Sequence, residues 1–107
     1  MNTADFIWMD GEFVAWDDAK VHVLSHSLHY GNAAIEGTKA YKTEKGYAIF
    51  KLREHTQRLL NSSKMTLMKV PFTVEELEAA QIELIKKNNF KDSSVYLRPL
   101  VYLGYGV

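Results

Sequence analysis

Apolar and polar positions alternate along the first fifty residues, which predicts extended structure there. Residues 6–9 are bulky and apolar, Asp10-Gly11 interrupts them, and the apolar pattern resumes over residues 12–16. An Asp-Gly pair supplies the positive-φ positions of a tight turn between two strands. The pattern therefore predicts a β-hairpin at the start of the chain.

The next predicted strands form a second hairpin. Residues 33–41 and 47–50 have strand character, and the Lys-Thr-Glu-Lys-Gly run between them supplies the turn. Residues 21–30 have no clear period, and we interpret them as a loop in which residues 25–29 can form a single helical turn.

The middle of the chain changes to a helical period. Leucines recur at helical spacing between charged residues, which predicts an amphipathic helix over residues 52–67, and Pro71 stops any continuation. Thr73 and Glu76 have the spacing of a capping box, so a second helix should begin there. Its buried stripe is predicted to contain Val74, Leu77, Gln81, Leu84 and Ile85. Lysines and an Asn able to adopt the left-handed conformation should end it near residue 89.

A last strand is predicted over residues 94–103, with two different faces. One face carries Val95, Leu97, Pro99, Val101 and Leu103, and the other carries Tyr96, Arg98, Leu100 and Tyr102. The first face is typical of a core. Strands grouped around two helices with short connections predict an α+β fold with a mostly antiparallel sheet and two main helices.

The composition indicates one packed domain and excludes several classes of function. Thirteen basic residues balance thirteen acidic ones over 107 residues, so no net field favours nucleic acid or an anionic membrane. No apolar run approaches the ~20 residues of a membrane span and no leader opens the chain, so we expect a soluble, cytoplasmic protein. The absence of cysteine excludes disulfides, thiolate zinc and thiol catalysis.

Three histidines, His22, His26 and His29, have the i, i+4, i+7 spacing that would place them on one face of a helix, where they could hold a transition metal. The alternating apolar residues around them argue against a helix, and no nearby carboxylate before Glu36 offers a further ligand. We therefore expect these histidines to form hydrogen bonds in a loop, and we expect no metal site.

Two helix arginines are candidate anion-binding groups. Arg53 and Arg58 are five residues apart, which turns a helix by about 500°, so their guanidinium groups point roughly 140° apart and cannot clamp one anion together. Either one of them faces a site while the other faces water, or both are solvated.

The Tyr96–Arg98 pair is a stronger candidate. An i, i+2 spacing on a strand places the phenol and the guanidinium side by side, a geometry that binds a carboxylate. A salt bridge to a neighbouring strand is the structural alternative. Tyr30 precedes Gly31 where a loop becomes a strand, so its phenol either reaches outward or packs in a turn. The residues alone thus indicate an anion-binding α+β domain.

Five runs carry a resemblance to a known family: IWMDGE at 7–12, KVHVLSHSLHYG at 20–31, EG at 36–37, REHTQRL at 53–59 and YLRPL at 96–100. In this order and spacing they resemble the branched-chain amino-acid aminotransferases, which are fold-type IV pyridoxal-phosphate enzymes. The resemblance covers nearly the whole chain. It also implies that the three-histidine cluster is a family feature of a loop.

The resemblance implies roles for individual residues. Arg58 would contact the phosphate of pyridoxal 5'-phosphate, and Arg53 would be structural. Tyr96 and Arg98 would line the substrate pocket and receive the acidic side chain of glutamate or lie near other bound carboxylates.

Three further residues are similar to pocket residues of the family. Tyr30 would reach into the site of the neighbouring subunit in a dimer, and Gly37 would offer a backbone contact to the substrate. Ile35 would line the hydrophobic pocket, where some relatives carry an aromatic side chain.

Residues 1–107 would then be the small N-terminal domain of such an enzyme, with a larger C-terminal domain absent from this chain. That domain would carry the lysine that binds the cofactor, because none of the lysines present occupies the matching motif. We therefore expect no catalytic residue in this chain and no activity from it alone. The Gly-aromatic-Gly ending directly after a predicted strand also indicates a longer protein.

The complete protein is expected to be a homodimer or a higher homo-oligomer. It would transfer the amino group between leucine, isoleucine or valine and 2-oxoglutarate. Two alternatives of the same fold are a D-amino-acid aminotransferase and an aminodeoxychorismate lyase. A third alternative is a non-catalytic module that binds carboxylates.

Overall fold

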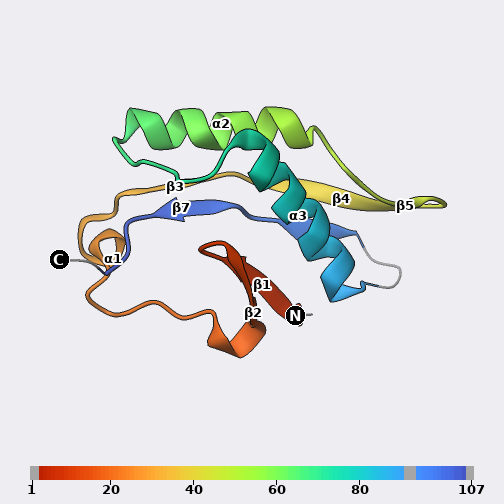
Figure 1. Cartoon of the computed structure of the whole chain (residues 1–107), viewed down its shortest axis with the longest axis horizontal. Helices are drawn as coiled ribbons and strands as arrows, with labels where there is room; N and C mark the ends of the chain where they lie inside the picture. The colour runs from red at the N-terminus through yellow and green to blue at the C-terminus, as the bar shows by residue number, and fades with distance from the viewer. Residues whose placement is uncertain (1–2, 91–93, 106–107) are drawn as a thin grey trace.

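The computed structural model describes residues 3–90 and 94–105, in which strands and helices form one sheet-and-helix unit (Figure 1). In chain order the elements are β1 (Phe6–Met9), β2 (Glu12–Ala15), a 3-10 turn (Trp16–Asp18), α1 (His26–Tyr30), β3 (Ala33–Ile35), β4 (Thr38–Thr43), β5 (Gly46–Ile49), α2 (Leu52–Met65), α3 (Val74–Asn88), β6 (Val95–Leu97) and β7 (Leu100–Tyr102). Every strand pair within these ranges is antiparallel, and α2 and α3 are the two long helices. The predicted α+β class is therefore confirmed.

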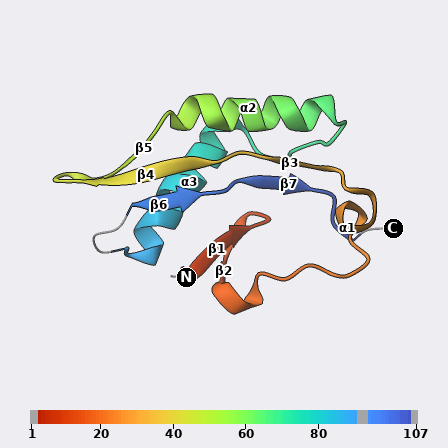
Figure 2. The same ribbon diagram turned by 180° about the vertical axis from the view of Figure 1, so that it is seen from behind.

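A long antiparallel ribbon, in which β3 and β4 run against β7 and β6, forms the centre of the molecule (Figures 1 and 2). In one half Ile35 stands opposite Leu100, and in the other half Thr38 stands opposite Leu97. The register is the same in both halves. The two halves therefore belong to one ribbon that is interrupted in the middle.

The interruption places Glu36 and Gly37 opposite Pro99 and Arg98. Proline has no backbone N–H and cannot complete the ladder there. One bond still crosses the gap, from the Glu36 N–H to the Pro99 carbonyl at 3.0 Å. The predictions of single strands over residues 33–41 and 94–103 were wrong in this respect, because each is divided into two.

Both long helices cover one face of the ribbon and bury two small apolar clusters. Under α2, Leu59 and Met68 pack on Ala34 of β3. Under α3, Ile85 packs on Ala40 of β4 and Leu97 of β6. In the last strand, Leu97 is buried and Val95, Val101 and Leu103 pack against the clusters, which confirms the core face that the sequence pattern predicted there.

The helix boundaries follow local signals. The capping box of α3 is present in both directions, with Glu76 N–H donating to Thr73 Oγ1 at 3.1 Å and Thr73 N–H to Glu76 Oε1 at 2.9 Å. Asn89 ends α3 in the left-handed conformation, at φ 51°. Helix α2 ends two residues earlier than predicted, at Met65. No helix in the described part of the chain is long and apolar enough to cross a membrane.

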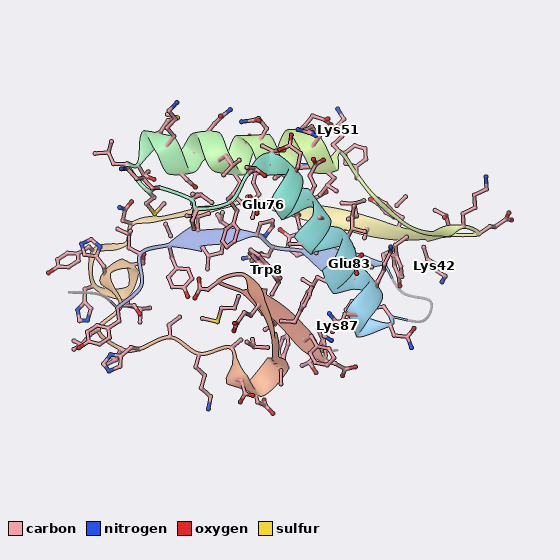
Figure 3. All side chains as sticks on the ribbon, viewed as in Figure 1. Trp8, Lys42, Lys51, Glu76, Glu83 and Lys87 are labelled. Carbon is pink, nitrogen blue, oxygen red and sulfur yellow. The ribbon has the colours of Figure 1, made fainter. Side chains whose placement is uncertain are left out.

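The predicted N-terminal hairpin is confirmed and is fastened to α3. Asp10 and Gly11 have φ of 54° and 90°, as the tight turn requires. Trp8 meets Phe72 edge-on at 5.1 Å, and Lys87 lies beside the hairpin with its ammonium over the Phe6 ring (Figure 3).

Asn88 forms the polar link between the hairpin and α3. Its Oδ1 accepts from the Asp5 and Phe6 N–H groups at 2.7 and 2.8 Å, and its Nδ2 donates to the Phe6 and Leu84 carbonyls. The residue is buried. One amide side chain therefore secures the first strand of the chain to the last turn of a helix.

Residues 21–30, interpreted as a loop, contain the short helix α1. Its first N–H groups, of His26 and Ser27, donate to the carbonyls of Gly104 and Leu103 at 3.2 and 3.0 Å. Ser27 Oγ in turn accepts from the Leu103 N–H at 2.7 Å. These partners are distant in sequence, which explains why the local pattern alone did not predict the helix.

We expect Asn88→Ala to destabilise the chain by about 1–2 kcal/mol, because it leaves the partly buried N–H groups of Asp5 and Phe6 without acceptors. Urea unfolding measures this loss, and amide exchange should accelerate most in β1. Asn61→Ala is the matched control, since the one side-chain hydrogen bond of Asn61 to the described residues is exposed and comes from Gln57. Equal unfolding midpoints for the two variants would contradict the prediction.

Candidate functional site

The gap in the central ribbon brings charged side chains to both of its faces. On the inner face lies Glu36, whose side chain is only 7% exposed. Its Oε2 accepts from Arg58 Nε and its Oε1 from Arg58 Nη2, both at 2.7 Å. Oε1 also meets His55 Nδ1 at 2.9 Å. A buried carboxylate on the ribbon is thus satisfied by two side chains from α2.

These partners set the ionisation of the group. The bidentate hydrogen bond from Arg58 holds the pKa of the Glu36 carboxyl below its ordinary value of 4.5; burial opposes this shift, and His55 adds to it. The same bond raises the pKa of Arg58. Glu36 is therefore an anion at neutral pH. An ionised carboxylate only accepts, so His55 Nδ1 must carry the proton in this contact.

Arg58 is bound on one side and open on the other. Its side chain is 64% exposed although Nε and Nη2 are paired. Within residues 3–90 and 94–105, no partner reaches Nη1. The guanidinium therefore presents a free, permanently charged edge to an anion.

On the outer face of the gap lie Gly37, Tyr96 and Arg98. The Arg98 guanidinium carbon lies 5.3 Å from the centre of the Tyr96 ring, a cation–π distance. The phenol lies across Gly37 so closely that any side chain at Gly37 would collide with it. Arg98 has no acidic partner among the described residues, so the predicted alternative of a structural salt bridge finds no support there.

An apolar surface continues along the same outer face. Ile35 and Leu100 stand opposite each other and are both about half exposed. This face is opposite to the one that carries Ala34 and Ala40, which pack against Leu59 of α2 and Ile85 of α3. A cation beside an exposed apolar strip suits a ligand with a carboxylate and an aliphatic part.

The structure therefore groups most of the predicted site residues. Ile35, Gly37, Tyr96 and Arg98 share the outer face of the ribbon, and Arg58 reaches the same gap from α2 on the inner side. Tyr30 lies apart from these residues, on α1, and is 75% exposed. The centre of its ring lies 4.5 Å from the centre of the His26 ring.

The two arginines of α2 have separate partners, as their spacing predicted. Arg53 pairs with Glu78 at 2.9 Å and with Glu75 at 3.4 Å, both on α3. It thus links the two helices. Arg58 alone points to the gap.

The prediction that all three histidines lie in a loop was wrong for His26 and His29, which lie on the short helix α1. His22 Nδ1 accepts from the Leu24 N–H at 3.0 Å, and His29 Nε2 meets the Val23 carbonyl at 2.8 Å. No group of three potential metal ligands occurs among the described residues.

Two site residues, Glu36 and His55, were missed in the sequence as contributors to the site, although both lie within the five runs that carry the resemblance. A signal was present for Glu36. It occupies an inward position between Ala34 and Thr38, and a carboxylate on a core face needs a cationic partner. The identity of that partner depends on how α2 packs.

The family of the chain follows from comparison with known proteins. Residues 33–106 match the family model of amino-transferase class IV. This range includes both strands of the ribbon, the gap and both long helices. The chain belongs to the class IV aminotransferase family.

The similar proteins are branched-chain aminotransferases. The branched-chain-amino-acid aminotransferases of Salmonella typhimurium and Escherichia coli (strain K12) are each 48% identical over 101 residues, which is 94% of this chain and 32% of theirs. The crystal structure of the branched-chain aminotransferase from Thermoproteus uzoniensis with norvaline matches with a TM-score of 0.90 at 41% identity, over 96% of this chain and 34% of that one. The chain thus spans about a third of the length of these relatives.

We expect Gly37→Ala to displace the Tyr96 ring, because an added Cβ would lie 2.9 Å from its Cζ. Since the ring is exposed and can move, the loss of stability should stay below about 1 kcal/mol. The change is measured by the Tyr96 ring signals in NMR. Gly104→Ala is the control, because its Cβ would meet Tyr102 at an ordinary 3.8 Å. Unmoved Tyr96 signals in Gly37→Ala would refute the close approach.

Acid should weaken the fold partly through Glu36. A lowered folded-state pKa contributes stability that is fully present above the ordinary value of 4.5 and is lost as pH falls through the folded value. We therefore expect Glu36→Gln to be less stable than wild type at about pH 7 and to lose less stability on going to about pH 3. Urea unfolding across this range measures the slope. Parallel curves would contradict the role of this group.

Proposed function

We propose that this chain is the N-terminal small domain of a branched-chain amino-acid aminotransferase that uses pyridoxal 5'-phosphate. The observation that carries the proposal is the pair of open guanidinium groups, Arg58 and Arg98, at one gap in the ribbon. Close identity to branched-chain aminotransferases over nearly all of this chain supports it. The relatives named above have the branched-chain activity in their names and do not favour the alternatives of the same fold.

Arg58 is the residue proposed to hold the cofactor phosphate. Its free Nη1 edge fits a phosphate dianion, because guanidinium N–H groups match phosphate oxygens in charge and shape. One of the similar branched-chain aminotransferases was solved with pyridoxamine 5'-phosphate. When bound, pyridoxal phosphate supplies the electron sink that makes amino-group transfer possible. We do not assign the lysine that would bind the cofactor covalently to any residue of this chain.

The outer face is proposed to bind the substrate. Arg98 and Tyr96 would hold a carboxylate, including the side chain of glutamate or the distal carboxylate of 2-oxoglutarate, and Gly37 would offer its backbone. Ile35 would contact the aliphatic side chain of leucine, isoleucine or valine. A similar branched-chain aminotransferase was solved complexed with 4-methylvaleric acid and with N-(5'-phosphopyridoxyl)-L-glutamate, which carry these two kinds of group.

The proposal also includes a homo-oligomeric assembly and a cytoplasmic location for the complete protein. Tyr30, which is exposed and lies apart from the other site residues, would contribute to the site of a neighbouring subunit in a homodimer or higher homo-oligomer. The lack of cysteine is compatible with a cytoplasmic location.

Assays of the complete protein with 2-oxoglutarate test the proposal. L-Leucine, L-isoleucine and L-valine should be converted, whereas D-alanine and aminodeoxychorismate should not. Failure to convert any of the three L-amino acids would end it. Conversion of D-alanine alone would favour the D-amino-acid enzyme.

In the complete protein, Arg98→Met should raise KM for 2-oxoglutarate by about 10-fold or more, because the distal carboxylate loses a charged hydrogen bond. KM for 4-methyl-2-oxopentanoate, which lacks that carboxylate, should change much less. Arg53→Met serves as the control, since Arg53 joins α2 to α3 away from the gap. Equal changes for both oxo acids would show that Arg98 does not select the dicarboxylate.

A further inference from the structure

Glu36 forms a bidentate pair with a cation that the proposed function assigns to the cofactor. We infer that Glu36 is a positioning residue, which fixes the Arg58 guanidinium so that its Nη1 edge receives the phosphate. This inference rests on the proposed function. It concerns a carboxylate that would not itself touch the cofactor.

The pattern of hydrogen bonds supports this role. Glu36 occupies Nε and Nη2 of Arg58, which form one edge of the planar group. Two bonds to one edge fix both the plane and the rotation of the guanidinium. Nη1 lies outside that edge, has no partner among the residues that the structure describes, and can receive an incoming anion.

Arg58 needs such a partner because its side chain is mostly exposed. A long exposed arginine samples many rotamers, and ordering it at the moment of binding costs affinity. The bidentate pair removes that cost before the anion arrives. Preorganised cations bind anions more tightly than mobile ones for this reason.

Glu36 is itself held rigidly enough to act as a reference point. It lies between β3 and β4, its N–H donates to the Pro99 carbonyl at 3.0 Å, and its side chain is buried. His55 Nδ1 meets Oε1 as a third partner at 2.9 Å. The position of the guanidinium is therefore tied to the ribbon through Glu36, as well as to α2, from which Arg58 extends.

A simpler electrostatic account makes the opposite prediction. If Glu36 only neutralised Arg58, its negative charge would repel a nearby phosphate dianion, and removing that charge would tighten binding. If it only stabilised the fold, its loss would weaken binding of every ligand of the site equally. The sign and the phosphate dependence of the effect therefore distinguish the three roles.

The experiment compares pyridoxal 5'-phosphate with pyridoxal, which lacks the phosphate. Dissociation constants of both are measured by absorbance titration of the complete protein after removal of bound cofactor, for wild type, Glu36→Gln and Glu78→Gln. Glu78→Gln is the matched control. It removes a carboxylate that pairs with Arg53, the other arginine of α2, and not with Arg58. Thermal unfolding without ligand is recorded for each variant.

For Glu36→Gln we expect the dissociation constant of pyridoxal 5'-phosphate to rise by about 10-fold, with that of pyridoxal nearly unchanged. Glu78→Gln should alter neither. In a second variant, Glu36→Asp, partial recovery of phosphate affinity is expected, because the carboxylate is retained.

Tighter or unchanged binding of pyridoxal 5'-phosphate to Glu36→Gln would overturn the inference, as would an equal loss for both ligands. In these cases wild-type binding still supports the proposed function. Wild-type protein that binds neither ligand would overturn the proposed function and this inference together.

Discussion

Proline at position 99 cannot donate a backbone hydrogen bond, and this constraint sets the position of the gap in the central ribbon. The register is the same on both sides, so the chain passes through the gap without losing its pairing. Glu36 still donates across it to the Pro99 carbonyl. The ribbon is thus locally freed from its ladder while its direction is preserved.

The gap separates opposite electrostatic environments. On the buried side, the Glu36 carboxylate forms hydrogen bonds with Arg58 and His55 of α2. On the open side, Arg98 lies over the Tyr96 ring without an acidic partner among the described residues. Because side chains alternate across a strand, neighbouring residues such as Glu36 and Gly37 serve different faces. One short segment can therefore position an arginine on each face of the ribbon, Arg58 on the buried side and Arg98 on the open side.

Local signals in the sequence predicted most of the fold. The Asp10-Gly11 turn, the Thr73–Glu76 capping box and Asn89 all depend on a few adjacent residues, and all were located correctly. The outward position of Tyr96 and Arg98 followed from strand alternation. Their role, and that of Arg58, came only from the family resemblance and stays a prediction.

Other features depend on contacts between distant segments and could not be predicted. The division of the ribbon was missed, although a proline within a strand pattern was a visible warning. The short helix α1 depends on carbonyls of Leu103 and Gly104, far along the chain. The Glu36–Arg58 pair needs the packing of α2 on the ribbon, which no local pattern specifies.

The link between Asn88 and the first strand has a consequence for synthesis on the ribosome. Its partners Asp5 and Phe6 are separated from it by 83 and 82 residues. The hairpin is translated before Asn88, which lies more than eighty residues beyond Phe6. Until α3 has been made, the hairpin has no helix to pack against. Contacts of such long separation form late and slow the folding of a domain. The strand that is translated before the helices is therefore secured only after α3 has been made.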